Sequence, residues 1–262
     1  MEHSGHNVAA DVTDYKEWSK SFDKRVEVLK SDKRRFVKFE DRKDESILTL
    51  ENNKGISKGK YHTTWRGIEL VKSSEDLIIL QHLLWDLKPA TIFEIGAYAG
   101  GSALWLSDIM KMYGYKTHVY SLDIDLSLVR DLAKKDENIS FIEGDASNIE
   151  SAFPEHLLKA YPHPWLLLED EHHHMNITLD YFDKFFVSGD YVCVEDATLH
   201  CATVCGMGLL EDMGYETWGD AKLTAMKEFI SKHPDRYMVD TYYNDFYGYN
   251  ASCNWNGYWK RV

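Results

Sequence analysis

The sequence predicts an α/β protein with a mostly parallel sheet flanked by helices and preceded by an N-terminal helical arm. Two observations favour this class. From about residue 61 onward, short apolar runs alternate with longer segments of helical periodicity, which is typical of strand–helix–strand units. The chain has 262 residues, of which 44% are hydrophobic and 13% aromatic, as in a folded globule with a sizeable core.

The elements follow one another in a regular order. Strands are expected at 90–96, 118–125, 139–145, 163–169 and 190–196, and helices at 75–87, 102–114, 127–136 and 178–186. Strands separated by helices imply right-handed crossovers and a parallel sheet. In such a sheet, ligands bind beyond the carboxyl ends of the strands. The acidic clusters of this chain lie at those ends.

Residues 1–60 differ from the rest in being polar and rich in charge. Phe22, Val26 and Leu29 recur at helical spacing, so we expect an arm with one or two amphipathic helices. The stretch "NNKGISKGK" (52–60) is interpreted as a link that closes the arm. The predicted domains are therefore an arm at 1–60 and a main domain at 61–262.

The formal charge of −13 argues against binding to nucleic acid or to anionic lipid. No apolar run is long enough to span a membrane, and the N-terminus lacks the pattern of a signal peptide, so a cytoplasmic location is expected. The cysteines form no CxxC pair, which fits a reducing compartment; they are Cys193, Cys201, Cys205 and Cys253. His200 with Cys201 and Cys205 matches no common zinc spacing.

The stretch "FEIGAYAGGSALWL" (93–106) runs from a strand through three glycines into a helix. Glycines there allow a sharp turn and close approach of a ligand, although GxxxGG is not the GxGxxG of dinucleotide binders. Asp123, 27 residues after Gly96, ends the next strand and could accept hydrogen bonds from ribose hydroxyls. Asp145 ends a third strand, where an adenine edge would lie. The alternative is that the glycines are tight packing and the acids are solvated.

The segment "EIGAYAGGSALWL" resembles motif I of class I S-adenosylmethionine-dependent methyltransferases. The wider stretch 63–110 and the end "FYGYNASCNWNGYWKRV" resemble the cephalosporin hydroxylase / rhamnosyl O-methyltransferase family. This resemblance implies a Rossmann-like class I methyltransferase fold with a seven-stranded sheet. It places Asp123 at the ribose and Asp145 near the adenine. The residues that it places around the methionine part of the cofactor are Glu94, Gly96, Tyr98, Gly100 and Ser102.

A second site is expected where "LLLEDEHHHM" (166–175) and "YVCVEDATLH" (191–200) end their strands in acids. Convergent carboxylates need a counter-ion, and a hard divalent cation, Mg²⁺ first, prefers oxygen ligands. The resemblance implies Glu169, Glu195 and Asp196 as metal ligands. Glu169 departs from the aspartate usual in the family and Asp170 lies beside it, so either residue could be the first ligand.

The resembling sugar O-methyltransferases have a metal ligand and a base at Asp-x-x-His, and Glu169-x-x-His172 matches this spacing. The resemblance thus implies that His172 is the general base, a role that suits its pKa. On a helix, His173 and His174 point elsewhere, so the run "HHH" does not make a zinc site. The alternative is that the histidines form a polar loop and the acids of the next strand end cap a helix.

The implied function is methyl transfer from S-adenosylmethionine to a hydroxyl of a small molecule, assisted by the metal, in natural-product tailoring. Methylation of an amine and a non-catalytic cofactor-binding subunit stay open, whereas an oxygenase would need two separated histidines. The aromatic tail around Trp255 and Trp259 is interpreted as core or subunit packing, or as a wall of the acceptor pocket. The arm, the tail and the resemblance favour a homo-oligomer.

Overall fold

The computed structural model describes residues 12–198 and 221–262, and its contacts divide the chain into two compact units, 1–35 and 36–262. In the first unit, α1 (Val12–Ser31) is a single helix of 20 residues. It is followed by a turn in which Arg34 donates hydrogen bonds to Asp32. The arm helix predicted from Val26 and Leu29 is therefore confirmed.

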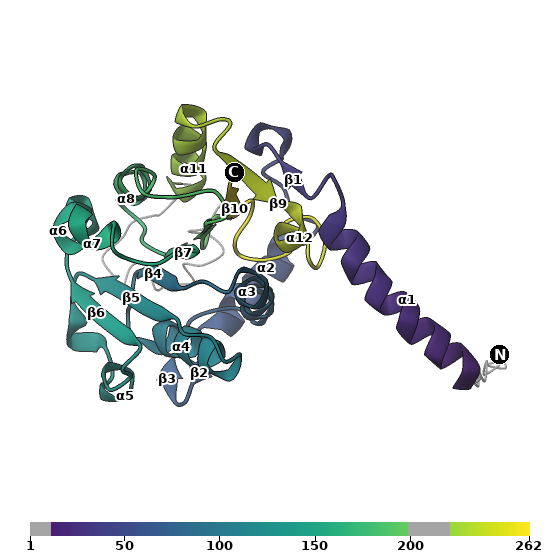
Figure 1. Ribbon diagram of the computed structural model, residues 1–262, viewed down its shortest axis with the longest axis horizontal. Coiled ribbons are helices and arrows are strands. Elements are labelled where there is room, and N and C mark those ends of the chain that lie inside the picture. Colours follow the sequence, from purple (N-terminus) through teal and green to yellow (C-terminus); the bar gives the residue numbers. More distant parts are fainter. Residues whose placement is uncertain (1–11, 199–220) are drawn as a thin grey trace. The chain divides into compact units, whose positions relative to one another are not determined.

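The second unit contains one eight-stranded sheet (Figure 1). Its order is β1 (Phe36–Val37), β9 (Tyr237–Asp240), β10 (Tyr258–Arg261), β8 (Tyr191–Val194), β7 (Trp165–Glu169), β4 (Thr91–Ile95), β5 (His118–Asp123) and β6 (Ile139–Glu143). The five strands from β8 to β6 are parallel, whereas β10 runs antiparallel to both of its neighbours. The mostly parallel sheet is confirmed, with eight strands in place of seven.

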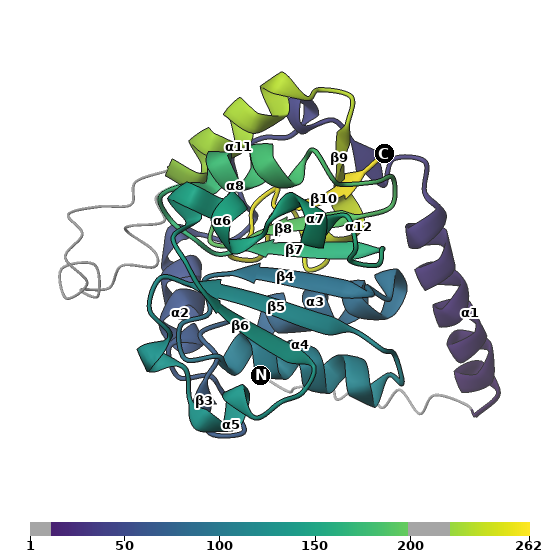
Figure 2. The ribbon, with the colours of Figure 1, turned by 60° about the vertical axis from the view of Figure 1, so that its left-hand side comes forward.

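Helices lie on both faces of this sheet (Figure 2). The α-helices are α2 (Leu50–Lys60), α3 (Ser74–Leu87), α4 (Gly101–Met112), α5 (Asp131–Lys134), α6 (Ile149–Ala152), α7 (Glu155–Leu158), α8 (Met175–Phe182), α11 (Ala221–Lys232) and α12 (Thr241–Asn244). Short 3-10 turns are η1 (Phe39–Asp41), η2 (Leu126–Leu128) and η3 (Ala146–Asn148), and β2 (Thr64–Trp65) pairs with β3 (Ile68–Glu69) in a hairpin.

Two apolar clusters hold these layers together. On one face, Phe93 of β4 packs with Leu179 and Phe182 of α8 and with residues of α11. On the other face, Ile92 packs with side chains of α3 and α4. Successive residues of β4 thus face opposite layers, as the period of a strand requires. All five residues of β4 are buried, which fits its apolar Ile92, Phe93 and Ile95 and makes Glu94 a buried acid within the strand.

The structure divides the chain at Arg35, not at residue 60. Phe36 and Val37 pair with β9, and Phe39 is buried in the core, so they belong to the second unit. The link predicted at 52–60 was wrong, because these residues lie in α2. Thr49 caps α2 by accepting a hydrogen bond from the backbone of Asn52.

Two other segments differ from expectation. The helix predicted over 127–136 is reduced to η2 and one turn at α5. In the tail, Trp259 is fully buried and stacks on Phe229, and Trp255 is also buried. These positions favour the interpretation of the tail as core packing. His200, Cys201 and Cys205 lie outside the described residues.

Candidate functional site

The predicted site residues lie at the carboxyl ends of adjacent parallel strands, which are tied together by backbone hydrogen bonds. The amide of Gly96, just after β4, donates to the carbonyl of Leu122 in β5 at 2.9 Å. On the other side, the amide of Asp170 donates to Ile95 at 3.0 Å, and the amide of Glu195 donates to Glu169 at 2.9 Å. Four strands, β5, β4, β7 and β8, therefore present their last residues along one edge.

The glycine turn after β4 needs its glycines for conformation and for space. Gly96 has φ +107° and Gly100 has φ +82°, both in the left-handed region that favours glycine. A Cβ on Gly96 would lie 3.2 Å from the carbonyl oxygen of Asp170. A Cβ on Gly101, the first residue of α4, would lie 2.1 Å from the carbonyl oxygen of Glu69. The turn is therefore packed against backbone on two sides.

Asp123 and Tyr98 are joined directly across this turn. The backbone amide of Tyr98 donates to Oδ2 of Asp123 at 2.7 Å, while Oδ1 accepts from Asp125 at 3.2 Å. The Tyr98 side chain is 51% exposed, so it stands over the edge and not in the core. Asp145 caps η3 by accepting from the amide of Ser147. A carboxylate oxygen has two lone pairs, so Asp123 retains capacity for a ligand hydroxyl.

Glu94 and Ser102 lie beneath the turn and are buried. Ser121 donates to Oε2 of Glu94. Among the described residues, Oε1 of Glu94 and Oγ of Ser102 make no hydrogen bond of normal geometry. Burial raises the pKa of Glu94, against the effects of Lys72 and of the neighbouring serine hydroxyls. Buried polar atoms of this kind are costly unless a ligand or water satisfies them, and they fit a site for a polar cofactor.

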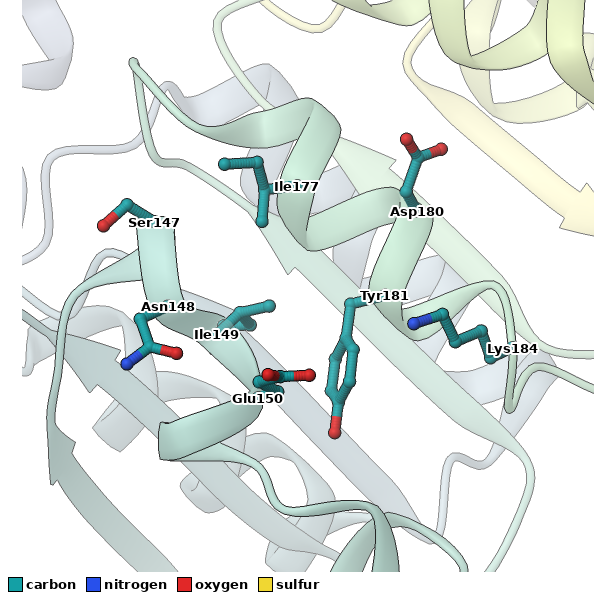
Figure 3. A pocket seen from close by; sticks show the side chains of 8 residues that line it. All are labelled: Ser147, Asn148, Ile149, Glu150, Ile177, Asp180, Tyr181 and Lys184. Carbon is teal, nitrogen blue, oxygen red and sulfur yellow. The ribbon is translucent and has the colours of Figure 1, made fainter.

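A groove of about 390 Å³ lies near this edge, between the segment 147–150 and α8. Figure 3 shows Glu150 and Tyr181 projecting into it. The hydroxyl of Tyr181 is already used, because it donates to the carbonyl of Phe153 at 2.7 Å. None of the predicted site residues lines this groove. It is therefore a neighbour of the site and not part of it.

The acids at the ends of β7 and β8 are paired with three buried lysines. Both carboxylate oxygens of Asp196 accept from Nζ of Lys60, at 2.8 and 2.7 Å. Glu195 accepts from Lys72, whose Nζ also lies 3.7 Å from Asp170. The sequence suggested that a metal ion alone balances the charge of these acids. In the structure, the ammonium groups of the lysines supply much of that positive charge.

The third lysine, Lys222 near the start of α11, lies between the two strand ends. Its Nζ is 3.7 Å from Glu169 and 3.6 Å from Asp170, and it donates to the carbonyl of Glu195 at 2.9 Å. Glu169 is fully buried, and among the described residues its carboxyl oxygens make no hydrogen bond of normal geometry, although the backbone of Glu171 lies near them. It faces the interior of the protein.

A possible metal cluster is formed by Asp170, His172 and Asp196. Each offers one ligand atom, and these atoms all lie within 4.8 Å of one another. The side chain of Asp170 is 26% exposed, so a cation could approach it. Of the two acids that could be the first ligand, Asp170 is the one in this cluster. Glu169 and Glu195 contribute no ligand atom to it, so their assignment as ligands stays a prediction.

The charges of the cluster shift its pKa values in opposite directions. Burial raises the pKa of Glu169 to about 8 against the effect of Lys222, and it also raises the pKa of Glu195 against the charge of its partner Lys72. Burial also acts on Asp170 and Asp196, but the nearby lysines outweigh it and lower both pKa values. Asp170 and Asp196 are thus held ionised at neutral pH, as a metal site requires.

Burial and, next, Lys222 lower the pKa of His172 to about 3. Its imidazole is therefore neutral at pH 7 and can accept a proton or coordinate a cation. His173 is exposed and is absent from the cluster, as expected for its position.

The three lysines were missed in the sequence. Lys60 lay in the stretch interpreted as a link, and Lys72 precedes the helix cap Ser73. Two of them lie more than 100 residues from the acid that they pair with: 136 residues for Lys60 and Asp196, and 123 for Lys72 and Glu195. Lys222 lies 53 residues from Glu169 and 27 from Glu195. The sequence contains one indication, since the run of acids has no lysine or arginine close to it in the chain. That indication does not say whether lysines or a metal ion provide the positive charge.

Comparison with known proteins identifies the family. The model of the family "Rhamnosyl O-methyltransferase/CmcI" matches residues 57–262. The chain belongs to this family. A rhamnosyl O-methyltransferase of Mycobacterium leprae is 33% identical over 142 residues, which are 53% of this chain and 62% of that protein. One of Mycobacterium bovis (strain BCG / Pasteur 1173P2) is 25% identical over 198 residues, which are 73% of this chain and 76% of that protein.

A solved structure described as "cmcI-D160 Mg-SAM" superimposes with a TM-score of 0.60 at 28% identity, and it covers 77% of each chain. The family expected from the glycine turn and the tail is thus confirmed, as is the class I methyltransferase fold. No described helix of this chain has the length and apolar character needed to cross a membrane.

Proposed function

We propose that this chain is an S-adenosylmethionine-dependent O-methyltransferase that uses a divalent metal ion, Mg²⁺ first, to methylate a hydroxyl of a small molecule. One observation carries the proposal: the glycine turn directly adjoins the acid cluster, since a Cβ on Gly96 would lie 3.2 Å from the carbonyl oxygen of Asp170. A cofactor at the turn and a metal at the cluster would therefore be neighbours. The CmcI relative described with both Mg and SAM supports the same pair of ligands.

The residues of the turn fit the cofactor. The left-handed Gly96 and Gly100 allow its close approach, and Asp123 is the acceptor for the ribose hydroxyls. Glu94 and Ser102 are buried beside each other and offer polar atoms that make no hydrogen bond of normal geometry among the described residues. These would meet the polar end of the methionine part.

The cluster fits a hard cation through its oxygen atoms. Asp170 and Asp196 would hold it, because both are ionised and close together. The third member, His172, is the proton acceptor in this proposal. Glu195, paired with Lys72, would position the strand end and not bind the metal directly.

The cofactor would supply a methyl group already activated on a sulfonium, and the metal would lower the pKa of the hydroxyl that it binds. The protein must then orient the hydroxyl toward the methyl group and remove its proton. His172 would accept that proton at a ring nitrogen as the methyl carbon bonds to the oxygen and its bond to the sulfonium sulfur breaks, which leaves S-adenosylhomocysteine. Because burial lowers the pKa of His172 to about 3, it is a weak base and needs a hydroxyl of lowered pKa.

The acceptor is a small molecule in this proposal, and the names of the mycobacterial relatives make a deoxysugar hydroxyl the first one to test. The expected setting is natural-product tailoring. We keep the homo-oligomer and the cytoplasmic location as parts of the same proposal.

Calorimetric titration with S-adenosylmethionine after treatment with EDTA tests the cofactor half. Asp123→Asn is expected to weaken binding about 10- to 100-fold, the range for losing hydrogen bonds to a charged group. Asp125→Asn, two residues later, is the matched control and should leave binding unchanged. Absence of binding by the unmodified chain would refute the proposal.

A non-catalytic cofactor-binding protein is the second candidate, and the lysine pairing of the acids favours it. Lys60 and Lys72 already neutralise Asp196 and Glu195, so the fold does not need a metal for charge balance. Binding of S-adenosylmethionine with no Mg²⁺ signal, and no turnover with any hydroxylated acceptor, would put this candidate first.

A further inference from the structure

Lys60 forms an ion pair with Asp196, which is one of the proposed metal ligands. It is the last residue of α2, its side chain is 5% exposed, and its Nζ contacts both carboxylate oxygens of Asp196. Asp196 is equally enclosed, with 11% of its side chain exposed. A buried ion pair of this geometry is not a solvated surface contact that water would exchange freely.

Asp196 is also one of the three residues whose ligand atoms converge with those of Asp170 and His172. A divalent cation on Asp196 would face the ammonium of Lys60 across the same carboxylate. The cation and the ammonium of Lys60 would both contact one carboxylate, and two positive charges so close together repel strongly in a region with little water. Lys60 and the metal cannot both keep full contact with Asp196.

We infer that Lys60 competes with the divalent cation for Asp196, and that its ammonium moves to Asp76 when the metal binds. This inference rests on the proposed metal site. It adds a residue that controls metal affinity without being a ligand.

A place for the displaced ammonium exists beside Asp196. A small cavity of about 10 Å³ is lined by Lys60, Asp76, Glu195 and Asp196, together with Lys72, Asn254 and the neighbouring loop. That volume is on the order of one water molecule, which is close to the size of an ammonium group. Lys60 therefore needs to move only within a space that it already borders.

Asp76 is another acceptor that lines this cavity. It is 4% exposed, and its Oδ2 accepts from the hydroxyl of Ser73 at 2.6 Å. Oδ1 makes no hydrogen bond of normal geometry within the described part of the chain. Oε1 of Glu195, in the same cavity, is in the same condition. The backbone of Cys253 lies near Asp76 and the carboxyl group of Asp170 lies near Glu195. A carboxylate oxygen has two lone pairs, so each acid retains capacity for a further donor.

The number of acids in the cluster favours transfer of the Lys60 ammonium to another acid over its release into solvent. Four carboxyl groups, on Glu169, Asp170, Glu195 and Asp196, face three ammonium groups, and Asp76 is a fifth acid beside them. Transfer of Lys60 to Asp76 frees Asp196 without leaving a buried ammonium unpaired, which would be strongly unfavourable.

The test measures Mn²⁺ binding by the full chain, from the electron paramagnetic resonance signal of free Mn²⁺. Lys60→Met removes the competitor and should tighten binding on the order of tenfold, a usual size for coupling between two ligands. Asp76→Asn removes the second position and should weaken binding by a similar factor. In the double variant, Asp76→Asn should have no further effect, because no ammonium remains to move.

Lys227→Met is the matched control, since Lys227 is half-exposed on α11 and pairs with Asp44, away from the cluster. Asp196→Asn should abolish binding in every background. If Lys60→Met does not fold, Lys60→Gln removes the charge and keeps a donor. Equal or weaker binding after removal of the charge would overturn the inference, as would an undiminished effect of Asp76→Asn in the double variant.

The failure of the proposed function has a different signature. If the unmodified chain binds no Mn²⁺ but Lys60→Met binds it, the competition is supported and metal assistance in the natural chain fails. If neither binds, the competition is refuted, whatever the result of the S-adenosylmethionine titration.

Discussion

The two halves of the site are built in different ways, although they share one edge of the sheet. The cofactor half comes from one short stretch, 94–102, plus the ends of β5 and β6, and it depends on backbone fit at Gly96, Gly100 and Gly101. The metal half comes from segments far apart in the chain and depends on charge. Its lysines arrive from α2, from the loop before α3 and from α11.

Neighbouring parts of one site can therefore lose their ligands for unrelated reasons. Steric change should damage the cofactor half and spare the metal half. Loss of charge should damage the metal half and leave the glycine turn intact. Substitutions in each half therefore test whether the two halves are independent.

The largest effect is expected for Lys72→Met. The ammonium of Lys72 is 4% exposed, pairs with Glu195 and lies 3.7 Å from Asp170. Removing one partner of a buried ion pair leaves an uncompensated charge, so we expect the free energy of unfolding to fall by about 3 to 5 kcal/mol. Urea unfolding at pH 7 measures this.

The control for Lys72→Met is Lys232→Met, because Lys232 pairs with Asp180 with about half of its side chain exposed. That change should cost less than about 1 kcal/mol. The double variant Lys72→Met with Glu195→Gln should regain part of the loss. Equal effects of the two single lysine substitutions would show that the cluster does not depend on charge.

Gly101→Ala should have the next largest effect. Its Cβ would lie 2.1 Å from the carbonyl oxygen of Glu69, which is backbone and cannot rotate away. Forcing an extra methyl into such a contact costs about 1 to 3 kcal/mol, measured by urea unfolding. S-adenosylmethionine affinity should fall with it, whereas Mn²⁺ affinity of the folded fraction should stay unchanged.

Gly55→Ala is the matched control for Gly101→Ala. Gly55 lies in α2, and a Cβ there meets nothing within 4 Å. Alanine should stabilise that helix by about 0.5 to 1 kcal/mol. A loss of Mn²⁺ binding in folded Gly101→Ala would mean that the two halves are coupled and not independent.

The same contrast explains what the sequence could predict. The turn after β4 was predictable because its strand, glycines and helix are contiguous, and a strand of five buried residues has an unmistakable apolar run. The ends of β7 and β8 were predictable for the same reason. In both strands, an apolar run is followed directly by acidic residues, which is a pattern that can be seen locally in the sequence.

The pairing of Lys60 and Lys72 could not be predicted, because it depends on tertiary packing across more than 100 residues. Lys60 ends a segment with three lysines and two glycines whose composition resembles a link, yet Thr49 caps it as α2. Likewise, β1 has only two residues and gains its place from pairing with β9. Such short elements have no periodic signal of their own.

The smallest effect is expected from His172→Gln. It concerns the metal half alone, and it appears only in how the free energy of unfolding depends on pH. Burial and Lys222 lower the pKa of His172 in the folded chain from 6.5 to about 3. As pH falls below 6.5, the unfolded chain takes up a proton that the folded chain refuses, so stability from this group is present above pH 6.5 and is lost toward pH 3. Between pH 6.5 and 5, the loss should be about 1 to 2 kcal/mol.

His172→Gln removes this titration, so its free energy of unfolding should fall less than that of the unmodified chain over the same window. His156→Gln is the control, because His156 is exposed on α7 and should leave the pH profile unchanged. If the unmodified chain and His172→Gln have parallel profiles from pH 6.5 to 5, His172 is solvated and not held among the lysines. The cluster would then lose its proton acceptor while Asp170 and Asp196 kept their places. The metal half of the site would in that case be a charge-balanced anchor for the strand ends, and the chemistry would have to come from the cofactor half alone.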